Sequence, residues 1–457
     1  MRSILAVLVL LAGAAIARGD DGPKEQALLR EVARDVSADA LRQTITKLVG
    51  FGTRHTASET QSDARGIGAA RRWVKARFGE INATCQCLDI VTPSQVVTAE
   101  RLPQPTEVMD VIAIQRGTSD PNRVIVISGH LDSRVTDVMN ATSDAPGAND
   151  DASGVAAVIE AARVLSRHKF PATLVYAALS GEEQGLHGGK ILAQYAKDQK
   201  WQVEAQLNND IVGNSHGGSG VREDGYVRVF SEGTRSLETP EETKRRRYNG
   251  GEVDSPSRNL ARFVAAHVER YMGGFKVRMV YRTDRFGRGG DQVPMLEAGF
   301  PAVRLTEAVE NYTRQHQDLR SENGVQYGDV IEGVDFEYLA NVTRVNVIAM
   351  AALAKAPAPP LDLKIEGAVT YNTKLSWNAS PGAVSHRVWW RETTAPQWEH
   401  NRMAPDPAAA VLEGVNIDDW FFGVSSISSD GYESPIQFPG AAGAFVNAPT
   451  PASQPTR

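Results

Sequence analysis

The stretch 129–154 contains the side chains with the clearest chemical potential. His130 and Asp132 directly follow the apolar run 124–128, which is typical of a buried strand. Asp150 lies in a second acidic cluster, at the predicted start of a helix. Imidazole and carboxylate groups are ligands of zinc and other divalent ions. The stretch therefore predicts part of a metal site.

Two more acidic groups follow predicted strands in the same way. Glu182 and Glu183 come shortly after the apolar segment 173–179, and Asp210 ends the next apolar run. The segments 124–128 and 173–179 enclose a predicted helix and so indicate a βαβ unit. Its right-handed crossover brings both strand ends to one edge of the sheet. We expect the acidic groups to meet the histidine at that edge.

This alternation of strands and helices predicts an α/β fold. We expect a mixed, largely parallel central sheet flanked by helices, followed by a small C-terminal β-sandwich. Helical spacing of apolar residues marks the segments 24–48, 65–78, 155–165, 260–271 and 336–354. Residue types that favour strands dominate 81–97 and 107–115, whereas the polar, glycine-rich stretch 214–258 is interpreted as an insertion or long loop.

Five sequence motifs hold the candidate residues. They are HLDS at 130–133, GANDDASG at 147–154, SGEEQGLHG at 180–188, NNDIVGN at 208–214 and the late His316. In this order they resemble the zinc exopeptidase family of bacterial leucyl aminopeptidases and glutamate carboxypeptidases, over roughly residues 32–354. Five motifs in one order are far more specific than any single motif.

The resemblance implies that five side chains hold two zinc ions as cofactors. His130 and Asp210 would bind one ion, Glu183 and His316 would bind the other, and Asp150 would bridge both. The chemistry of a dinuclear site asks for the same kind of set. Two zinc ions about 3.5–4 Å apart need a shared carboxylate and an open face for the substrate.

Two further carboxylates complete the expected active site. The resemblance assigns Glu182 as the general base and Asp132 as the carboxylate behind His130, whose second N–H it can accept. The expected reaction is attack of a zinc-bridging hydroxide, activated by Glu182, on the amide bond nearest the N-terminus of a peptide. The sequence is thus expected to encode a zinc-dependent aminopeptidase.

Acidic residues in such positions also have plainer roles. Asp150 and Asp151 could cap the helix that follows them, and this is the favoured role of Asp151. Glu182 and Glu183 could form a solvated loop pair, and Asp210 could be a turn residue. Their common position at successive strand ends favours the metal site.

The second histidine ligand has rivals. His316 is followed by Gln and Asp, where relatives often have a small hydroxyl residue. The other histidines considered are His187 on a glycine-rich turn beside the glutamate pair, His216 in the predicted insertion and His267 in a predicted helix. We retain His316, because it is the histidine that matches the family pattern.

Two candidate residues, Asp291 and Arg288, bear on the substrate. Asp291 precedes Gln292, where many relatives have Asp-His, and the matching aspartate lines the pocket of the related glutaminyl cyclases. Arg285 and Arg288 could contact a substrate carboxylate, which would favour a carboxypeptidase acting on acidic dipeptides, or they could pair with nearby acids. A further alternative is a non-catalytic binding protein with a structural metal site, although such sites are usually rich in Cys or His.

Changes in composition divide the chain into segments. Residues 1–17 have the basic start, apolar core and small-x-small end of a signal peptide, which predicts export to the periplasm or the cell exterior. A peptidase domain is expected over 23–355, a stiff Pro-rich linker over 356–360 and a fibronectin type III-like sandwich over 361–446. The Pro/Thr/Ser-rich tail 447–457 is expected to be disordered.

Charge restricts the possible partners. Lys and Arg total 49 against 55 Asp and Glu, a net charge of −6, so nucleic-acid binding has no electrostatic support. The basic run 244–247 is interpreted as solvated surface. The apolar core near the N-terminus is too short for stable membrane insertion. The expected partner is a peptide substrate, and the C-terminal module could contact a protein or a surface. Cys85 and Cys87 could close only a small ring or remain thiols.

Overall fold

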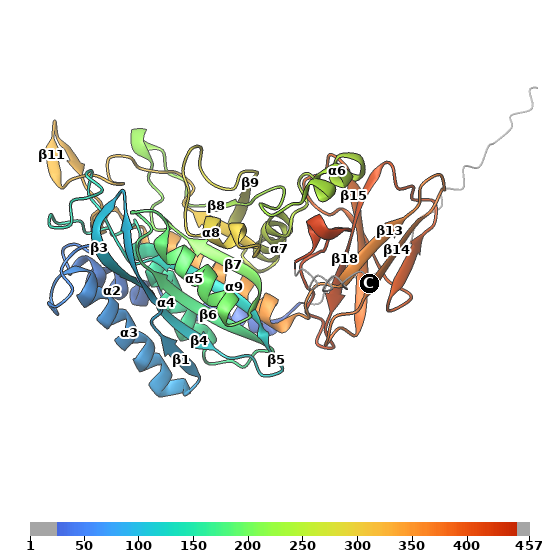
Figure 1. The fold of residues 1–457 in the computed structure, drawn as a ribbon, viewed down its shortest axis with the longest axis horizontal. Coiled ribbons are helices and arrows are strands. Elements are labelled where there is room, and N and C mark those ends of the chain that lie inside the picture. Colours follow the sequence, from blue (N-terminus) through green and yellow to red (C-terminus); the bar gives the residue numbers. More distant parts are fainter. Residues whose placement is uncertain (1–24, 446–457) are drawn as a thin grey trace, which may run out of the picture.

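A mixed sheet of eight strands forms the centre of the computed structural model, which describes residues 25–445 (Figure 1). From edge to edge the strands are β1 (Leu88–Val91), β4 (Val111–Gln115), β6 (Ala172–Leu179), β5 (Asp120–His130), β7 (Gln202–Asn209), β10 (Ala302–Thr306), β8 (Tyr226–Phe230) and β9 (Lys276–Val280). The central strands β6, β5, β7 and β10 are parallel, whereas β4 is antiparallel to β6 and β8 to β10. The predicted largely parallel sheet is confirmed.

Side chains of β5 alternate between two apolar cores. Ile125 and Ile127 belong to one core, whereas Val124 and Val126 belong to the other. The first core is shared with α1 (Ala27–Asp35), α2 (Ala38–Val49), α3 (Gly66–Cys85), α4 (Ala152–Leu165), α7 (Pro256–Tyr271) and α9 (Phe336–Lys355), and the second with α5 (His187–Asp198) and α8 (Gln292–Glu297). Because helices cover both faces, residues 123–130 are all buried, as is usual for a parallel sheet.

The register of the parallel strands aligns their carboxyl ends. His130 at the end of β5 lies opposite Leu179 at the end of β6. Asn209 at the end of β7 lies opposite Leu305 of β10. The predicted βαβ unit of β5, α4 and β6 therefore delivers its two strand ends to the same edge of the sheet.

Two expectations about secondary structure are wrong. Helix α3 continues to Cys85, so residues 81–85 are helical and not part of a strand. The stretch 214–258 is not only a loop, because β8 lies within it and pairs with β10 and β9, and α6 (Pro240–Asn249) follows. Five residues give too short a pattern to distinguish a strand when both its partners are distant in sequence. Helix α6 contains the basic run and buries none of its residues.

The C-terminal module contains two three-stranded antiparallel sheets. One has β13 (Leu361–Glu366), β14 (Thr373–Asn378) and β17 (Ala409–Leu412), and the other has β16 (His400–Met403), β15 (Ser385–Glu392) and β18 (Trp420–Ile427). Trp377, which is 4% exposed, lies in the core with Leu375 and Phe422. The module lies beside α6 and α7 in Figure 1. The Pro-rich segment before it is largely buried, and its backbone oxygens at Ala356 and Pro359 accept from Arg123 of β5 and from Ser380 of the module.

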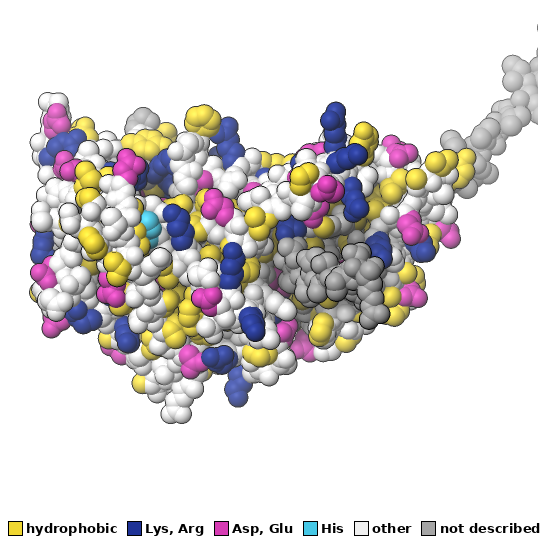
Figure 2. Space-filling view, in the orientation of Figure 1, with side chains coloured by type: hydrophobic (Ala, Val, Ile, Leu, Met, Phe, Trp, Pro, Cys, Tyr) yellow, Lys and Arg dark blue, Asp and Glu magenta, His cyan; other side chains and the backbone are white. Residues whose placement is uncertain are grey.

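Cys85 and Cys87 form a disulfide. Among residues 25–445, no helix has the length and apolar character needed to cross a membrane. Figure 2 shows Lys and Arg side chains interspersed with Asp and Glu over the described part of one face. The expected signal peptide and tail lie outside the described residues.

Candidate metal centre

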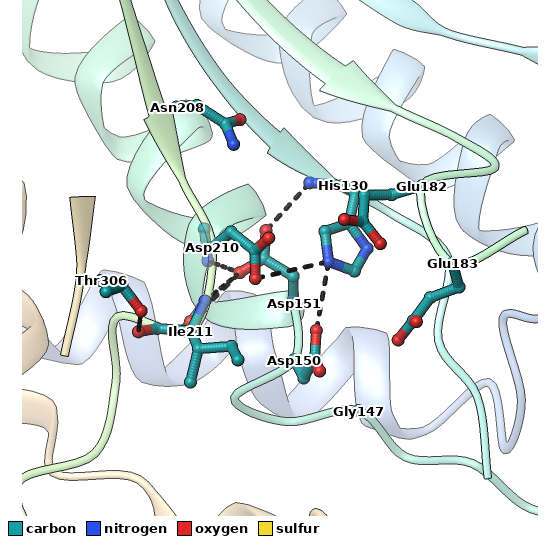
Figure 3. A network of polar contacts seen from close by, with 12 residues as sticks. His130, Gly147, Asp150, Asp151, Glu182, Glu183, Asn208, Asp210, Ile211 and Thr306 are labelled. Atoms are coloured by element: carbon teal, nitrogen blue, oxygen red, sulfur yellow. Dashed lines mark hydrogen bonds and ion pairs between the residues drawn. The ribbon is translucent and has the colours of Figure 1, made fainter. Parts of the chain in front are cut away.

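Two groups of acidic and histidine side chains lie at the carboxyl ends of the parallel strands. The first group is His130, Asp150 and Asp210, which point toward one another in Figure 3. The second group is Asp150, Glu183 and His316. Each residue contributes one possible ligand atom, and the atoms of a group all lie within 4.8 Å of one another. The structure thus brings together the five residues that the sequence marked as metal ligands, and Asp150 belongs to both groups.

His130 is the last residue of β5 and is 1% exposed. Its Nε2 lies 3.1 Å from Asp150 Oδ1 and 3.8 Å from Asp210 Oδ1. Within residues 25–445 this nitrogen has no hydrogen-bond partner, although it is buried. The ring nitrogen therefore faces carboxylate oxygens in an arrangement that suits a shared cation better than a shared proton.

Asp150 lies between the two histidines. Its Oδ1 is the atom close to His130, and its Oδ2 is 2.9 Å from His316 Nε2. The same His316 nitrogen is 3.0 Å from Glu183 Oε1. Each carboxylate oxygen of Asp150 thus faces a different histidine, which is the geometry that a carboxylate needs in order to bridge two ions.

The donor set fits zinc. With zinc–nitrogen and zinc–oxygen bonds of about 2.0 Å, the ligand atoms of a tetrahedral ion lie roughly 3.3 Å apart. The separations here of 2.9–3.8 Å are of that size. Glu183 Oε1 is also buried without a hydrogen-bond partner in the described chain. A buried carboxylate oxygen needs a positive partner to compensate for the lost water, and here that partner is the His316 ring or a cation bound beside it.

The electrostatics of the site favour positive charge. Burial lowers the pKa of His130, but three neighbouring carboxylates outweigh burial and raise it well above the ordinary value. Burial likewise opposes charge on His316, yet Glu183 and Asp150 raise the pKa of His316 to about 10. Both histidines would therefore hold protons at neutral pH in the absence of metal, and metal binding would displace these protons.

Asp132 supports the site in a way that only partly matches the expectation. His130 Nδ1 lies 3.1 Å from the backbone oxygen of Asp132, whereas the carboxylate is 3.6 Å away. The carboxylate instead accepts hydrogen bonds from the backbone N–H groups of Glu182 and Glu183, at 3.3 and 3.1 Å. Asp132 therefore positions His130 through its backbone carbonyl and positions the backbone of Glu182 and Glu183 through its side chain.

Glu182 lies beside His130 but belongs to neither metal group (Figure 3). Glu182 as a whole is partly exposed. Burial of its carboxyl group, together with the negative charge of Asp210 and Glu183, raises the pKa of Glu182 well above the ordinary value. A carboxyl group with a raised pKa that is not tied to metal can accept and return a proton.

Asp151 caps helix α4, as expected. Its Oδ1 accepts from the backbone N–H of Gly154 at 2.9 Å. Its Oδ2 accepts from the backbone N–H of His130 at 2.9 Å, which joins the helix to β5. A side chain at Gly154 would collide with the backbone oxygen of Asn209, so this glycine lets α4 begin directly against the end of β7.

Two charged residues that sequence reasoning missed hold the loop before α4. Asp329 accepts from the backbone N–H groups of Asn149 at 3.0 Å and Asp150 at 2.7 Å. Arg54 is fully buried and donates to the backbone oxygens of Pro146 and Gly147. A single charged residue in a loop carries no sequence pattern that would predict such a contact.

Comparison with known proteins identifies the family. The model of "Peptidase family M28" matches residues 110–329. A probable zinc metalloprotease of Leptosphaeria maculans is 44% identical over 422 residues, 91% of this chain and 97% of the relative. The chain belongs to peptidase family M28. A probable zinc metalloprotease of Pyricularia oryzae is 42% identical and covers 90% of this chain and 84% of its own.

Solved structures share the fold of this M28 peptidase. LapB of Legionella pneumophila is 19% identical, with a TM-score of 0.52 over 72% of this chain and 76% of its own. The LapA aminopeptidase of the same organism is 19% identical, with a TM-score of 0.51 over 77% of this chain and 80% of its own. Family membership confirms the expectation of a metallopeptidase.

The rival histidines of the M28 peptidase lie apart from its metal groups. His216 contacts Ser215, and His267 lies in α7, where its Nδ1 is 2.9 Å from the backbone oxygen of Phe263. His187 begins α5 and belongs to neither group. In the described chain, His316 is the histidine placed with Asp150 and Glu183.

The two expected substrate residues have protein partners. Asp291 is 1% exposed and accepts from the backbone N–H of Gly189 at 3.1 Å, and burial raises the pKa of Asp291 to about 7. Arg288 Nη1 lies 3.1 Å from Glu310, and Arg285 Nη1 lies 3.6 Å from the same carboxylate. Of the two roles left open for these arginines, pairing with acidic residues is the one observed.

Proposed function

We propose that this M28 peptidase is an exported di-zinc aminopeptidase that removes N-terminal residues from peptides. The observation that carries the proposal is the shared carboxylate of Asp150, whose two oxygens face His130 and His316 separately. The names of the fungal relatives, which are probable zinc metalloproteases, support zinc as the metal. The name of the Legionella LapA structure supports an aminopeptidase.

The residues would divide the work as follows. His130 and Asp210 would hold one zinc ion, Glu183 and His316 the other, and Asp150 both. Bound zinc would lower the pKa of a water molecule towards about 7 and polarise the scissile carbonyl. Glu182 would take the proton of the attacking water and return it to the leaving amine. Asp132 would keep His130 and the glutamate pair in position.

The charges near the site support an aminopeptidase over a carboxypeptidase. A carboxypeptidase acting on acidic dipeptides would need an available cation for the substrate carboxylate. Arg285 and Arg288 both contact Glu310, so their charge is partly balanced within the protein. Asp291 is 1% exposed and interacts electrostatically with His130 and Asp210, so its ionised form adds negative potential beside the metal groups.

A substrate panel with metal analysis tests the proposal. The purified protein should contain two zinc ions per active chain and should hydrolyse aminoacyl substrates with a free N-terminus. N-blocked acidic dipeptides with a free C-terminus should be poor substrates. Preference for the blocked dipeptides would replace the aminopeptidase by the carboxypeptidase, and fewer than two ions per active chain would exclude the di-zinc site.

Export and the C-terminal module are further parts of the proposal. The basic start and apolar core of residues 1–17 support cleavage after Ala17 and release to the periplasm or the cell exterior. N-terminal sequencing of the protein from its native compartment should begin at Arg18. The alternating strands and buried Trp377 support a fibronectin type III-like module over 361–446, which could contact a protein or a surface.

A further inference from the structure

Arg304 is a buried arginine that contacts a candidate metal ligand. It lies in β10 and is 0% exposed. Its Nη1 is 2.7 Å from Asp210 Oδ2, and its Nη2 donates to the backbone oxygen of Asp210 at 3.3 Å. Strands β10 and β7 are parallel neighbours, and Asp210 directly follows β7. The Arg304 guanidinium therefore contacts both the carboxylate and the backbone oxygen of Asp210.

The contact divides the two oxygens of Asp210 between different partners. Oδ1 is the oxygen that faces His130 Nε2 in the first metal group. Oδ2 is the oxygen that Arg304 holds. A fixed guanidinium on the second oxygen of a carboxylate leaves the first oxygen as the one best placed to bind an ion.

We propose that Arg304 is a positioning residue of the zinc site, which keeps Asp210 as a one-oxygen ligand. The inference rests on the proposed di-zinc function, because Asp210 must hold an ion for its orientation to matter. Groups behind a ligand that fix its orientation tune both the affinity and the electronic character of the bound ion.

Arg304 is itself held by a buried network. Its Nη1 lies 3.3 Å from Asp284 Oδ2 and donates to the backbone oxygen of Gly289 at 3.1 Å. Gln292 Nε2 donates to the same oxygen of Asp284 at 2.6 Å, and Gln292 Oε1 accepts from Asn208 at 3.2 Å. Gln292 is the position where the sequence departs from the Asp-His of many relatives. Here the amide of Gln292 donates to Asp284 and accepts from Asn208, so it links Asp284, the second carboxylate beside Arg304, to β7.

The packing leaves Arg304 little freedom. A side chain atom added at Gly290 would meet its Nη1 at 2.5 Å. The guanidinium therefore packs directly against the backbone of Gly290 and is held by the backbone oxygen of Gly289. Lysine could keep the positive charge, but a single ammonium on a flexible chain cannot reproduce the planar set of contacts to Asp210, Asp284 and Gly289.

The test compares Arg304→Met and Arg304→Lys with Arg123→Met as a matched control. Arg123 is also buried and lies 3.0 Å from buried Glu204. It lies near the start of β5, whereas the metal groups lie at the carboxyl ends of the strands. Zinc affinity is measured by competition with a chelator, and the visible absorption spectrum is measured on cobalt-substituted protein. Unfolding in urea reports stability for each variant.

Arg304→Met should weaken zinc binding by about 10–100-fold, the usual effect of losing a group behind a metal ligand. Its cobalt bands should become weaker, because a second oxygen of Asp210 raises the coordination number. The zinc affinity and the cobalt bands of Arg304→Lys should lie between those of Arg304→Met and those of the wild type. Arg123→Met should lose stability but keep the zinc affinity and the cobalt spectrum of the wild type, since it disturbs a buried ion pair far from the site.

Asp284→Asn keeps the test decisive if Arg304→Met does not fold. This variant retains Arg304 but removes the second carboxylate beside it. It should change the zinc affinity and the cobalt spectrum in the same direction as Arg304→Met, by a smaller amount. Zinc affinity within twofold of wild type and an unchanged cobalt spectrum, in both Arg304→Lys and Asp284→Asn, would overturn the inference. Wild-type protein that binds fewer than two ions would instead overturn the proposed di-zinc function.

Discussion

Glu182 and Glu183 are neighbours in the chain, but their carboxylates have different surroundings. Glu183 Oε1 lies 3.0 Å from His316, whereas Glu182 belongs to neither metal group. We predict that Glu182→Gln retains two zinc ions and loses about 10²–10⁴-fold in turnover, since a general base typically contributes that much. Glu183→Gln should instead lower the zinc content. Zinc analysis and aminoacyl hydrolysis measure both effects, and normal turnover in Glu182→Gln would remove Glu182 from the role of base.

His316 should make the stability of the zinc-free protein depend on pH. Its pKa rises from the ordinary histidine value of 6.5 to about 10 in the fold. A histidine with a raised pKa stabilises the folded state fully below 6.5 and loses this contribution as pH rises towards 10. In chelator, the Tm of the wild type should therefore fall more steeply over this range than the Tm of His316→Gln. Equal slopes would show that the proton on His316 does not stabilise the fold.

The loop that leads into α4 depends on Asp329. Its carboxylate accepts from the backbone N–H groups of Asn149 and Asp150. In Asp329→Asn one acceptor becomes an N–H donor facing these N–H groups, so the variant should lose about 1–3 kcal/mol of unfolding free energy and bind zinc more weakly. Urea unfolding and zinc titration measure the two effects.

The control for this loop is the N-cap of α2. Ser37→Ala removes the side chain that accepts from the backbone N–H of Ala40 at 3.2 Å. It should cost about 1 kcal/mol without changing zinc binding. If Asp329→Asn also kept the zinc affinity of the wild type, the position of Asp150 would not depend on Asp329.

The two parts of the molecule are joined by buried charge. Asp254 lies 2.7 Å from Arg262 of α7 and 2.7 Å from Arg391 of the C-terminal module, and all three side chains are at most 2% exposed. Asp254→Asn should cost about 3–5 kcal/mol, because it leaves buried arginines without their carboxylate. The exposed pair of Arg65 and Asp144 offers a control, and Asp144→Asn should cost at most about 1 kcal/mol. Urea unfolding measures the free energy of unfolding of both variants. Equal losses in the two variants would mean that the buried charges of the interface contribute little to stability.

Much of the site could be predicted along the chain, because each strand end brings its own residues. His130 ends β5, Glu182 and Glu183 follow β6, and Asp210 follows β7, so one periodic pattern of apolar strands placed four candidate residues at one edge. The Asp151 cap was predictable for the same local reason. Such residues are positioned by their immediate neighbours in sequence, and the order of strand and helix alone indicates where they will lie.

Contacts between distant segments were decided only by the tertiary structure. Arg304 holds Asp210 and is itself held by Asp284, and both come from later parts of the chain. Strand β8 pairs with β10 and β9, which both follow it at a distance in sequence. The carboxylate of Asp132 was expected behind the histidine; it lies 3.6 Å from His130 Nδ1 and also accepts from the backbone N–H groups of Glu182 and Glu183. The stretch 129–154 supplies His130 and Asp150, and later strand ends supply Glu183 and Asp210. The position of His316 and the groups that hold these side chains depend on long-range packing, because the energy of a buried charge is determined by whichever group the fold brings beside it.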